Sequence, residues 1–151
     1  MSTDKYENVT QLMEVFQRFA KADWRKKTID GLKPSEIRVL VRLKNNLDNG
    51  GASMTVSELS KILQVTSPTV TQMINSLLAS GHVNRSADPS DRRITEITLT
   101  DKGSRFAEKA LERYHALFKG VIDRLGKEQS DQLIVTLNQL FDYLESYSYN
   151  E

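Results

Sequence analysis

Apolar residues spaced three and four positions apart run through the first third of the chain and predict two helices. The first set extends from about Thr3 to Lys27 and marks an amphipathic helix. Pro34 suits a first helical position, and the same period continues from there until Asn49-Gly50-Gly51 stops it, which predicts a second helix. The apolar positions are Val9, Leu12, Met13, Phe16, Phe19 and Ala20 in the first helix, and Ile37, Leu40, Val41 and Leu47 in the second.

Two short helices with a tight turn between them are predicted next. Thr55 and Glu58 have the spacing of a capping box, in which a hydroxyl and a carboxylate satisfy backbone N–H groups at a helix start. The apolar period breaks near Val65-Thr66. Ser67-Pro68 then suits the N-cap and first turn of a fourth helix, which Gly81 ends. Buried positions are expected at Val56, Leu59, Ile62 and Leu63 in the third helix, and at Val70, Met73 or Ile74, and Leu77 in the fourth.

A hairpin is predicted after the fourth helix. Residues 82–86 and 93–99 suit short strands, the second because apolar and polar residues alternate from Ile94 to Leu99. Asp88-Pro89-Ser90-Asp91 has the residue types of the connecting turn. Two short helices followed by a basic hairpin are typical of a helix-turn-helix with a wing.

The last third of the chain is predicted to form two long helices. One starts at Thr100-Asp101 and the other follows Gly126, and the apolar residues of each alternate spacings of four and three, as in a coiled coil. A single seam of this kind can pack against the chain's own core, whereas terminal seams on both helices favour a dimer. The seam residues are Ala107, Leu111, Tyr114, Phe118, Val121 and Leu125, then Leu133, Leu137, Leu140, Leu144 and Tyr147.

The outer face of the fourth helix fits the major groove of DNA. Its small hydroxyl and amide side chains can approach base edges, and Gln72 can pair with N6 and N7 of adenine. Pro68 and the methyl group of Thr69 can contact thymine methyl groups. The same residues also suit a solvated surface helix, but the hairpin that follows favours DNA recognition. The outer residues are Thr69, Thr71, Gln72, Asn75 and Ser76.

The segment DPSDRR gathers acidic and basic residues at the tip of the hairpin. One arginine can pair with an aspartate while another projects outward. A guanidinium has a fixed charge and a planar shape that suit a narrow minor groove. An Asp-Arg turn that serves structure alone is the alternative.

Composition excludes several classes of protein. The 151 residues include no cysteine, which excludes disulfides, thiolate metal sites and thiol-based redox sensing. His82 and His115 stand alone, and no metal-binding, Walker or dinucleotide motif occurs, so neither an enzyme nor a metal or cofactor site is expected. The N-terminus lacks a secretory signal and no apolar stretch approaches a membrane span, so we expect a cytoplasmic protein with no membrane partner.

The distribution of charge matters more than the net charge of +1. Residues 17–44 contain nine basic and three acidic residues, a density that can face DNA phosphates. Lys33 and Arg38 are the candidate phosphate contacts within it. A solvated helical face is the alternative interpretation.

The segment from Thr55 to Gly103 resembles the MarR family of bacterial regulators. The helix-turn-helix core matches, as do Leu78 and Gly81 before the first wing strand. Two further matches are the triplet Asp91-Arg92-Arg93 and the closing segment Leu99-Thr100-Asp101-Lys102-Gly103. The flanking helices match in order and length, so the resemblance covers nearly the whole chain.

The resemblance implies a mainly α fold with a small β wing, forming one domain over residues 1–151. Residues 33–103 would be a winged helix-turn-helix lobe that binds DNA, and residues 1–32 and 104–151 would be dimerisation helices. The implied function is a repressor that acts as a homodimer on a pseudo-palindromic operator in double-stranded DNA. A small aromatic or anionic effector, bound between the dimerisation helices and the lobe, would release it.

The resemblance also assigns roles to residues. Of the wing triplet, Asp91 would steady the hairpin and Arg93 is favoured for the minor groove, with Arg92 as the alternative. Lys21 and Trp24, with Arg38 and Tyr114, are candidates for the effector cleft, although Trp24 also suits packing on the first helix. The recognition-helix role falls on Ser67, Pro68, Thr69, Thr71 and Gln72.

One residue departs from the family pattern, and one other function is open. His82 stands where an apolar or aromatic residue is usual, so the strand there would be more exposed or pH-responsive, unless His82 is a packing residue.

The alternative function is a winged-helix module that binds protein and no operator. The salt dependence of DNA binding would distinguish this module from a DNA-binding regulator, because the affinity of a regulator for DNA falls steeply as the salt concentration rises.

Overall fold

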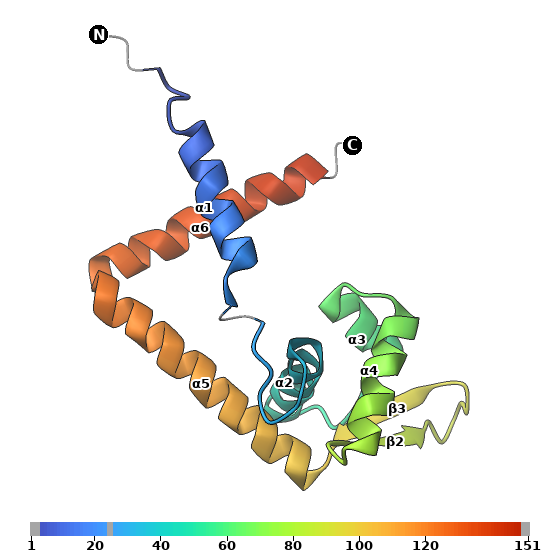
Figure 1. Cartoon of the computed structure of the whole chain (residues 1–151). Coiled ribbons are helices and arrows are strands. Elements are labelled where there is room, and N and C mark those ends of the chain that lie inside the picture. The colour runs from blue at the N-terminus through green and yellow to red at the C-terminus, as the bar shows by residue number, and fades with distance from the viewer. Residues whose placement is uncertain (1–3, 24–25, 149–151) are drawn as a thin grey trace. The chain divides into compact units, whose positions relative to one another are not determined.

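The computed structural model describes residues 4–23 and 26–148 of the chain. Most of them are helical and the strands form one small sheet, so the predicted mainly α fold is confirmed (Figure 1). Within these ranges, no helix combines the length and apolar character needed to cross a membrane. The helices are α1 (Val9–Lys21), α2 (Pro34–Asp48), α3 (Val56–Leu63), α4 (Ser67–Ala79), α5 (Asp101–Leu125) and α6 (Lys127–Ser148), and the strands are β1 (Met54–Thr55), β2 (Val83–Ala87) and β3 (Thr95–Leu99).

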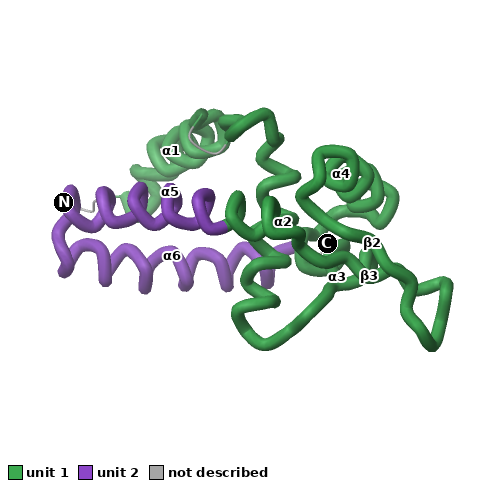
Figure 2. Tube along the Cα trace, turned by 90° about the horizontal axis from the view of Figure 1, so that it is seen from below, with its two compact units in different colours: residues 1–107 green, residues 108–151 purple. Residues whose placement is uncertain are grey.

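The contacts of the chain divide it into two compact units, Met1–Ala107 and Glu108–Glu151 (Figure 2). The boundary falls within α5, whose first two turns belong to the first unit. In the second unit α5 and α6 meet at Gly126, whose φ of +80° lies in the left-handed region that glycine favours. The predicted division into a DNA-binding lobe and dimerisation helices stays a prediction.

The largest fully buried side chains of the first unit come from three helices and one strand. Apolar residues three and four apart share one face of a helix, and burying each large one stabilises the fold by about 1.5–3 kcal/mol. The prediction that Ile62 is buried was wrong, because its side chain is 44% exposed on α3. The largest fully buried side chains are Ile37, Val39 and Leu40 of α2, Leu59 of α3, Val70, Ile74 and Leu77 of α4, and Ile97 of β3.

The sheet has three antiparallel strands in the order β1-β3-β2. Met54 of β1 is opposite Ile97, and Val83 of β2 is opposite Leu99. The hairpin was predicted at 82–86 and 93–99. Strand β2 lies one residue later than predicted, and β3 begins two residues later than predicted and ends where predicted. Strand β1 was not predicted, because two residues are too few to show an alternating pattern.

The first helix is shorter than the sequence predicted. It begins at Val9, after hydrogen-bonded turns from Asp4 onward, and ends at Lys21 because Ala22 has an extended backbone with ψ of 133°. The predicted start at Thr3 lies outside the described residues. Apolar spacing alone did not predict these ends, since it indicates which face of a helix is apolar and not where the backbone leaves the helical conformation.

The helix starts follow capping chemistry. Thr55 and Glu58 form the predicted capping box, with the Glu58 amide donating to Thr55 Oγ1 at 3.1 Å. At α4 the predicted N-cap, Ser67, was wrong. Thr66 is the N-cap, because its extended backbone lets Oγ1 accept from the Thr69 amide at 3.4 Å, and Ser67 is the first helical residue.

A buried carboxylate joins α2 to α4. Glu36 is 5% exposed, and its Oε1 accepts from the Lys33 amide at 3.2 Å at the start of α2. Its Oε2 accepts from the Ser76 hydroxyl at 2.8 Å, forty residues along the chain. Ser76, predicted for the outer face of the fourth helix, therefore also holds that helix against α2.

Replacing Glu36 by alanine should destabilise the fold. Glu36→Ala leaves the Lys33 amide and the Ser76 hydroxyl without their partner in a part-buried place, which costs about 1–3 kcal/mol. Glu36→Gln should cost less, because its amide can accept from Lys33 and donate to Ser76. Urea unfolding at one fixed protein concentration would compare them, and an equal loss for both variants would contradict the role given to these two hydrogen bonds.

Candidate nucleic-acid interface

Helix α4 presents a polar face opposite its buried stripe. Ser67, Pro68 and Gln72 are exposed, whereas Thr69 and Thr71 are partly buried. The hydroxyl of Thr69 lies 2.8 Å from Thr66 Oγ1, and the hydroxyl of Thr71 donates to the Ser67 carbonyl at 3.0 Å. Gln72 makes no hydrogen bond to any residue that the structure describes, so its amide is free to bind a ligand from solvent.

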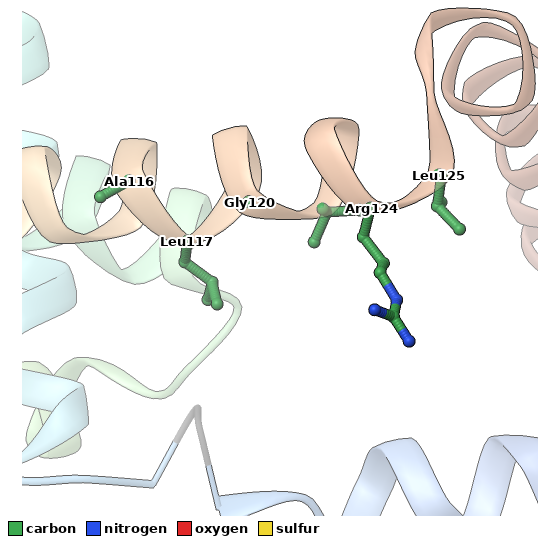
Figure 3. A pocket seen from close by; sticks show the side chains of 6 residues that line it. Ala116, Leu117, Gly120, Arg124 and Leu125 are labelled. Carbon is green, nitrogen blue, oxygen red and sulfur yellow. The ribbon is translucent and has the colours of Figure 1, made fainter.

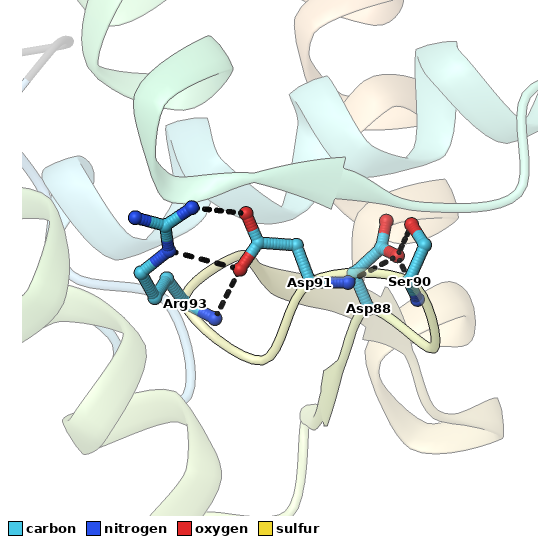
Figure 4. Close-up of polar contacts among 4 residues, drawn as sticks. All are labelled: Asp88, Ser90, Asp91 and Arg93. Carbon is cyan, nitrogen blue, oxygen red and sulfur yellow. Dashed lines mark hydrogen bonds and ion pairs between the residues drawn. The ribbon is translucent and has the colours of Figure 1, made fainter.

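The tip of the hairpin is held by two aspartates (Figure 4). Oδ1 of Asp88 accepts from the amide and the hydroxyl of Ser90 at 2.7 and 2.5 Å. Oδ1 of Asp91 accepts from the amide and Nε of Arg93, and its Oδ2 accepts from Nη2, at 3.0 to 3.1 Å. The fork of Arg93 is therefore oriented by a bidentate ion pair.

The same contacts set the electrostatics of the tip. Hydrogen bonds from the side chain and then the backbone of Ser90 lower the pKa of Asp88. Hydrogen bonds from the side chain and then the backbone of Arg93 lower the pKa of Asp91, and the pairing raises the pKa of Arg93 in return. Both carboxylates and the guanidinium thus stay ionised, and within the turn Asp91 pairs with the charge of Arg93 whereas Asp88 accepts from the uncharged donors of Ser90.

The two arginines of the triplet differ in their surroundings. The side chain of Arg93 is 91% exposed although Asp91 pairs with it. Arg92 is also exposed, and no hydrogen bond or ion pair joins it to any part of the chain that the structure describes. Which of them enters a groove stays a prediction, and the geometry holds only Arg93 in a fixed orientation.

A hollow of about 440 Å³ brings α4 and the wing together. The start of α3 lines one side of it, Thr71 of α4 another, and Arg93 of the wing a third. Residues that lie more than twenty positions apart in the sequence therefore share one surface. The remaining lining residues are Thr55, Val56, Ser57, Ile94 and Thr95.

The other predicted contact residues lie on the first two helices. Lys33 is exposed at the N-cap of α2 and Arg38 is exposed on the same helix. Lys21 is exposed at the last residue of α1, and Trp24 lies outside the described residues. The phosphate contacts and the effector cleft stay predictions. Among the residues that the structure describes, no group of His, Asp and Glu could hold a metal ion.

A polar joint fixes the end of α4 to the start of α5. Gly81 turns the chain with φ of +78°, and its carbonyl accepts from the Thr100 hydroxyl at 2.7 Å. The Thr100 amide donates to the His82 carbonyl at 3.1 Å. Lys102 Nζ donates to the Ser80 carbonyl at 2.8 Å. A Cβ at position 103 would collide with the His82 carbonyl oxygen, so Gly103 permits this close approach.

His82 is a packing residue in this joint. It is 6% exposed, its Nδ1 lies 2.6 Å from the Ser80 hydroxyl, and its ring meets Phe106 edge to face at 5.6 Å. Of the two alternatives for His82, an exposed start of the strand was wrong. Burial, reinforced by the charge of Lys102, lowers the pKa of His82 below its ordinary value of 6.5, and Glu36 opposes this shift.

Exposed apolar residues cover much of α1, α5 and α6. On α5 a hollow of about 520 Å³ has a lining that is apolar apart from Arg124 (Figure 3). Seam residues of both terminal helices are among those exposed, including Phe118, Leu137 and Leu144 at 52%, 50% and 47%. Large exposed apolar patches are typical of interaction surfaces, and the dimer that the seams predict stays a prediction.

Comparison with known proteins identifies the family. A sequence model described as MarR family matches residues 30–94, from the turn before α2 to the wing. An uncharacterised HTH-type transcriptional regulator of Bacillus subtilis, YhbI, is 32% identical over 102 residues, which are 68% of this chain and 66% of YhbI. The chain belongs to the MarR family. It is thus a transcriptional regulator and not an enzyme.

Two further comparisons agree with the MarR assignment. The HTH-type transcriptional repressor YetL of Bacillus subtilis is 26% identical over 117 residues, covering 78% of this chain and 68% of YetL. The crystal structure of Streptococcus pneumoniae FabT in complex with DNA has a TM-score of 0.73 at 23% identity, covering 94% of this chain and 99% of FabT. The predicted winged-helix fold of the MarR family is confirmed, with α3 and α4 as the helix-turn-helix and β2 and β3 as the wing.

One polar contact beside the candidate interface was not predicted from the sequence. Nη2 of Arg85, on β2, donates to Oδ1 of Asn75, on α4, at 2.6 Å. Asn75 was expected on the outer face of the helix, and Arg85 was assigned no role. The sequence carried only a weak signal for Arg85, a basic residue within a short strand, and the contact exists because the fold brings the strand against the helix.

The stability of this MarR-family chain should fall as pH decreases below about 6.5. The folded chain holds His82 neutral because its pKa is lowered, whereas the unfolded chain takes up a proton near the ordinary pKa. His82→Phe keeps a ring against Phe106 and should reduce the dependence of unfolding free energy on pH between about pH 7 and about pH 5. Urea unfolding at several pH values measures it.

The control for this experiment is the other histidine. His115 is exposed on α5, and His115→Gln should leave the pH dependence as it is in the wild type. If His82→Phe and the wild type lost stability in parallel as the pH fell, His82 would not be the group responsible.

Proposed function

We propose that the chain is a sequence-specific DNA-binding repressor that acts as a homodimer on a pseudo-palindromic operator. The observation that carries the proposal is the shared hollow of the helix-turn-helix and the wing, which Thr71 and Arg93 both line. In winged-helix proteins the recognition helix enters the major groove, and an arginine on the hairpin suits the adjacent minor groove. One protomer would thus contact both grooves at each half-site.

The side chains on α4 fit this role. Ser67, Pro68 and Gln72 are exposed near the N-terminal end of the helix, the end from which recognition helices contact base edges. Gln72 keeps both its donor and its acceptor, the pattern that matches adenine. Thr69 and Thr71 use their hydroxyl groups within the helix start, and their methyl groups are the parts suited to thymine contacts.

The homodimer is supported by the apolar surfaces of the terminal helices. The large apolar side chains that are at least half exposed on α1, α5 and α6 would lose this exposure in a two-fold interface, and their burial would stabilise the dimer. They are Val9, Leu12, Met13, Phe19, Phe118, Ile134, Val135, Leu137, Phe141, Tyr143 and Tyr147.

Repression and release by a ligand belong to the same proposal. YetL is named a repressor and FabT was crystallised with DNA, which supports a DNA-binding repressor for this chain. The resemblance to the family is the basis for a small aromatic or anionic effector, with Lys21 as a candidate contact. Such an effector would release DNA only by binding more tightly to the conformation that binds DNA less well.

A selection experiment tests the proposal. Purified protein is incubated with a random double-stranded DNA library at moderate salt, bound sequences are recovered, and the mass of the complex is measured. Enrichment of a palindrome bound by two chains supports the proposal. Absence of any DNA enrichment, with a folded dimer, would overturn it and favour a winged-helix module that binds protein.

Removing the wing arginine should weaken operator binding. Arg93→Ala deletes the oriented guanidinium and should cost about 1–3 kcal/mol of binding free energy while leaving the dimer folded. Arg92→Ala is the matched variant next to it, and it should cost less because no part of the described chain orients Arg92. Fluorescence anisotropy with a labelled operator measures both, and a larger loss for Arg92→Ala would exchange the two roles.

A further inference from the structure

Asn75 and Arg85 form a polar pair at the edge of the proposed DNA-binding surface. Asn75 is exposed on α4, three residues after Gln72, and Arg85 is exposed on β2, the strand that α4 contacts (Figure 1). Nη2 of Arg85 donates to Oδ1 of Asn75 at 2.6 Å. No other hydrogen bond or ion pair joins either side chain to the residues that the structure describes.

The direction of this hydrogen bond determines what the pair presents to solvent. A guanidinium carries N–H donors and no acceptor, so the oxygen of Asn75 must be the atom that faces Arg85. The amide nitrogen of Asn75 is then left with its two N–H groups unused. Arg85 has donated one of its five N–H groups and keeps its positive charge. The exposed part of the pair therefore consists mainly of donors and a full positive charge.

This donor set favours a phosphate over a base edge. Bidentate pairing with adenine needs the amide oxygen and the amide nitrogen of an asparagine together, and in Asn75 the oxygen is occupied by Arg85. A phosphate oxygen accepts hydrogen bonds and is negatively charged, so it matches both groups at once. In protein–DNA complexes, half to two-thirds of the hydrogen bonds go to phosphate and sugar.

The place of the pair along α4 agrees with this chemistry. Recognition helices contact base edges from their N-terminal residues, which here are Ser67 to Gln72. Asn75 lies beyond them on the same side of the helix, and Arg85 approaches it from the wing strand. The pair thus lies at the border of the surface proposed to enter the major groove, where the DNA backbone would pass.

We propose that Asn75 and Arg85 together bind one phosphate of the DNA backbone at each half-site and so fix the register of α4 on the operator. The inference rests on the proposed function, since it requires the chain to bind DNA. It adds two residues outside the predicted recognition set, and it gives them a positioning role that carries no sequence preference of its own.

The experiment measures the salt dependence of operator binding. Each phosphate contact contributes about −0.9 to the slope of log affinity against log salt concentration, so a dimer that loses two contacts loses roughly 1.8. Arg85→Ala should therefore lose about tenfold less affinity than the wild type between about 50 and about 200 mM salt, from a weaker start. At any one salt concentration, Arg85→Ala should weaken binding relative to the wild type by the same factor for the operator and for every single-base variant of the operator.

Four further variants separate a phosphate contact from other roles. Arg85→Lys keeps the charge and should retain the wild-type slope. Asn75→Ala keeps the charge of Arg85, so it should lower the affinity for all sequences with the slope unchanged. Arg105→Ala removes the same charge from an exposed position on α5 and should leave operator binding close to that of the wild type. In contrast, Gln72→Ala should lose affinity at one base pair.

The outcomes distinguish this inference from the proposed function. Wild-type protein that binds no DNA at any salt concentration overturns both. Wild-type protein that binds the operator, with an unchanged slope for Arg85→Ala, overturns the phosphate contact and leaves the proposed function standing. A loss confined to one base pair in Arg85→Ala or Asn75→Ala would mean that the pair contacts a base, and it would overturn the inference as well.

Discussion

The rotation of α4 about its own axis is the constraint on which the candidate site depends. Val70, Ile74 and Leu77 are fully buried, and this stripe determines that Gln72 and Asn75 point outward. A change of phase by one residue, about 100°, would bury the polar face and expose the apolar one. The hydrogen bond between Ser76 and Glu36 adds a polar constraint to the same rotation, because a hydroxyl can reach the buried carboxylate from one orientation only.

In the wing, hydrogen bonds and an ion pair orient the acidic side chains toward donors within the turn. The hairpin tip that we propose approaches DNA carries two aspartates, and unpaired carboxylates there would repel phosphates. Asp88 turns its oxygen toward the donors of Ser90, and Asp91 turns both oxygens toward Arg93. The acidic groups therefore shape the turn, and the exposed guanidinium faces outward already oriented. This arrangement reduces the entropy that Arg93 would lose on binding.

Local chemistry in the sequence was enough to predict much of the fold. Pro34 opens α2, Thr55 and Glu58 cap α3, and Gly81 turns the chain after α4, because each signal acts within a few residues. The N-cap of α4 was wrong by one residue, since Thr66 and Ser67 both carry a suitable hydroxyl and only the backbone geometry selects Thr66. Contacts between residues far apart in the chain could not be predicted from the sequence. The bond from Ser76 to Glu36 and the one from Arg85 to Asn75 depend on how the helices and strands pack.

The close approach at Gly103 affects how mutational scans of this chain should be interpreted. Gly103 has an ordinary helical backbone, so glycine is needed there only because the His82 carbonyl oxygen occupies the place of a side chain. Even alanine at this position would push apart the start of the wing and the first turn of α5. A genetic screen for regulatory defects would recover such changes as readily as changes on α4. Position 103 would then be mistaken for a point of DNA contact, although its effect is purely steric and lies within the protein.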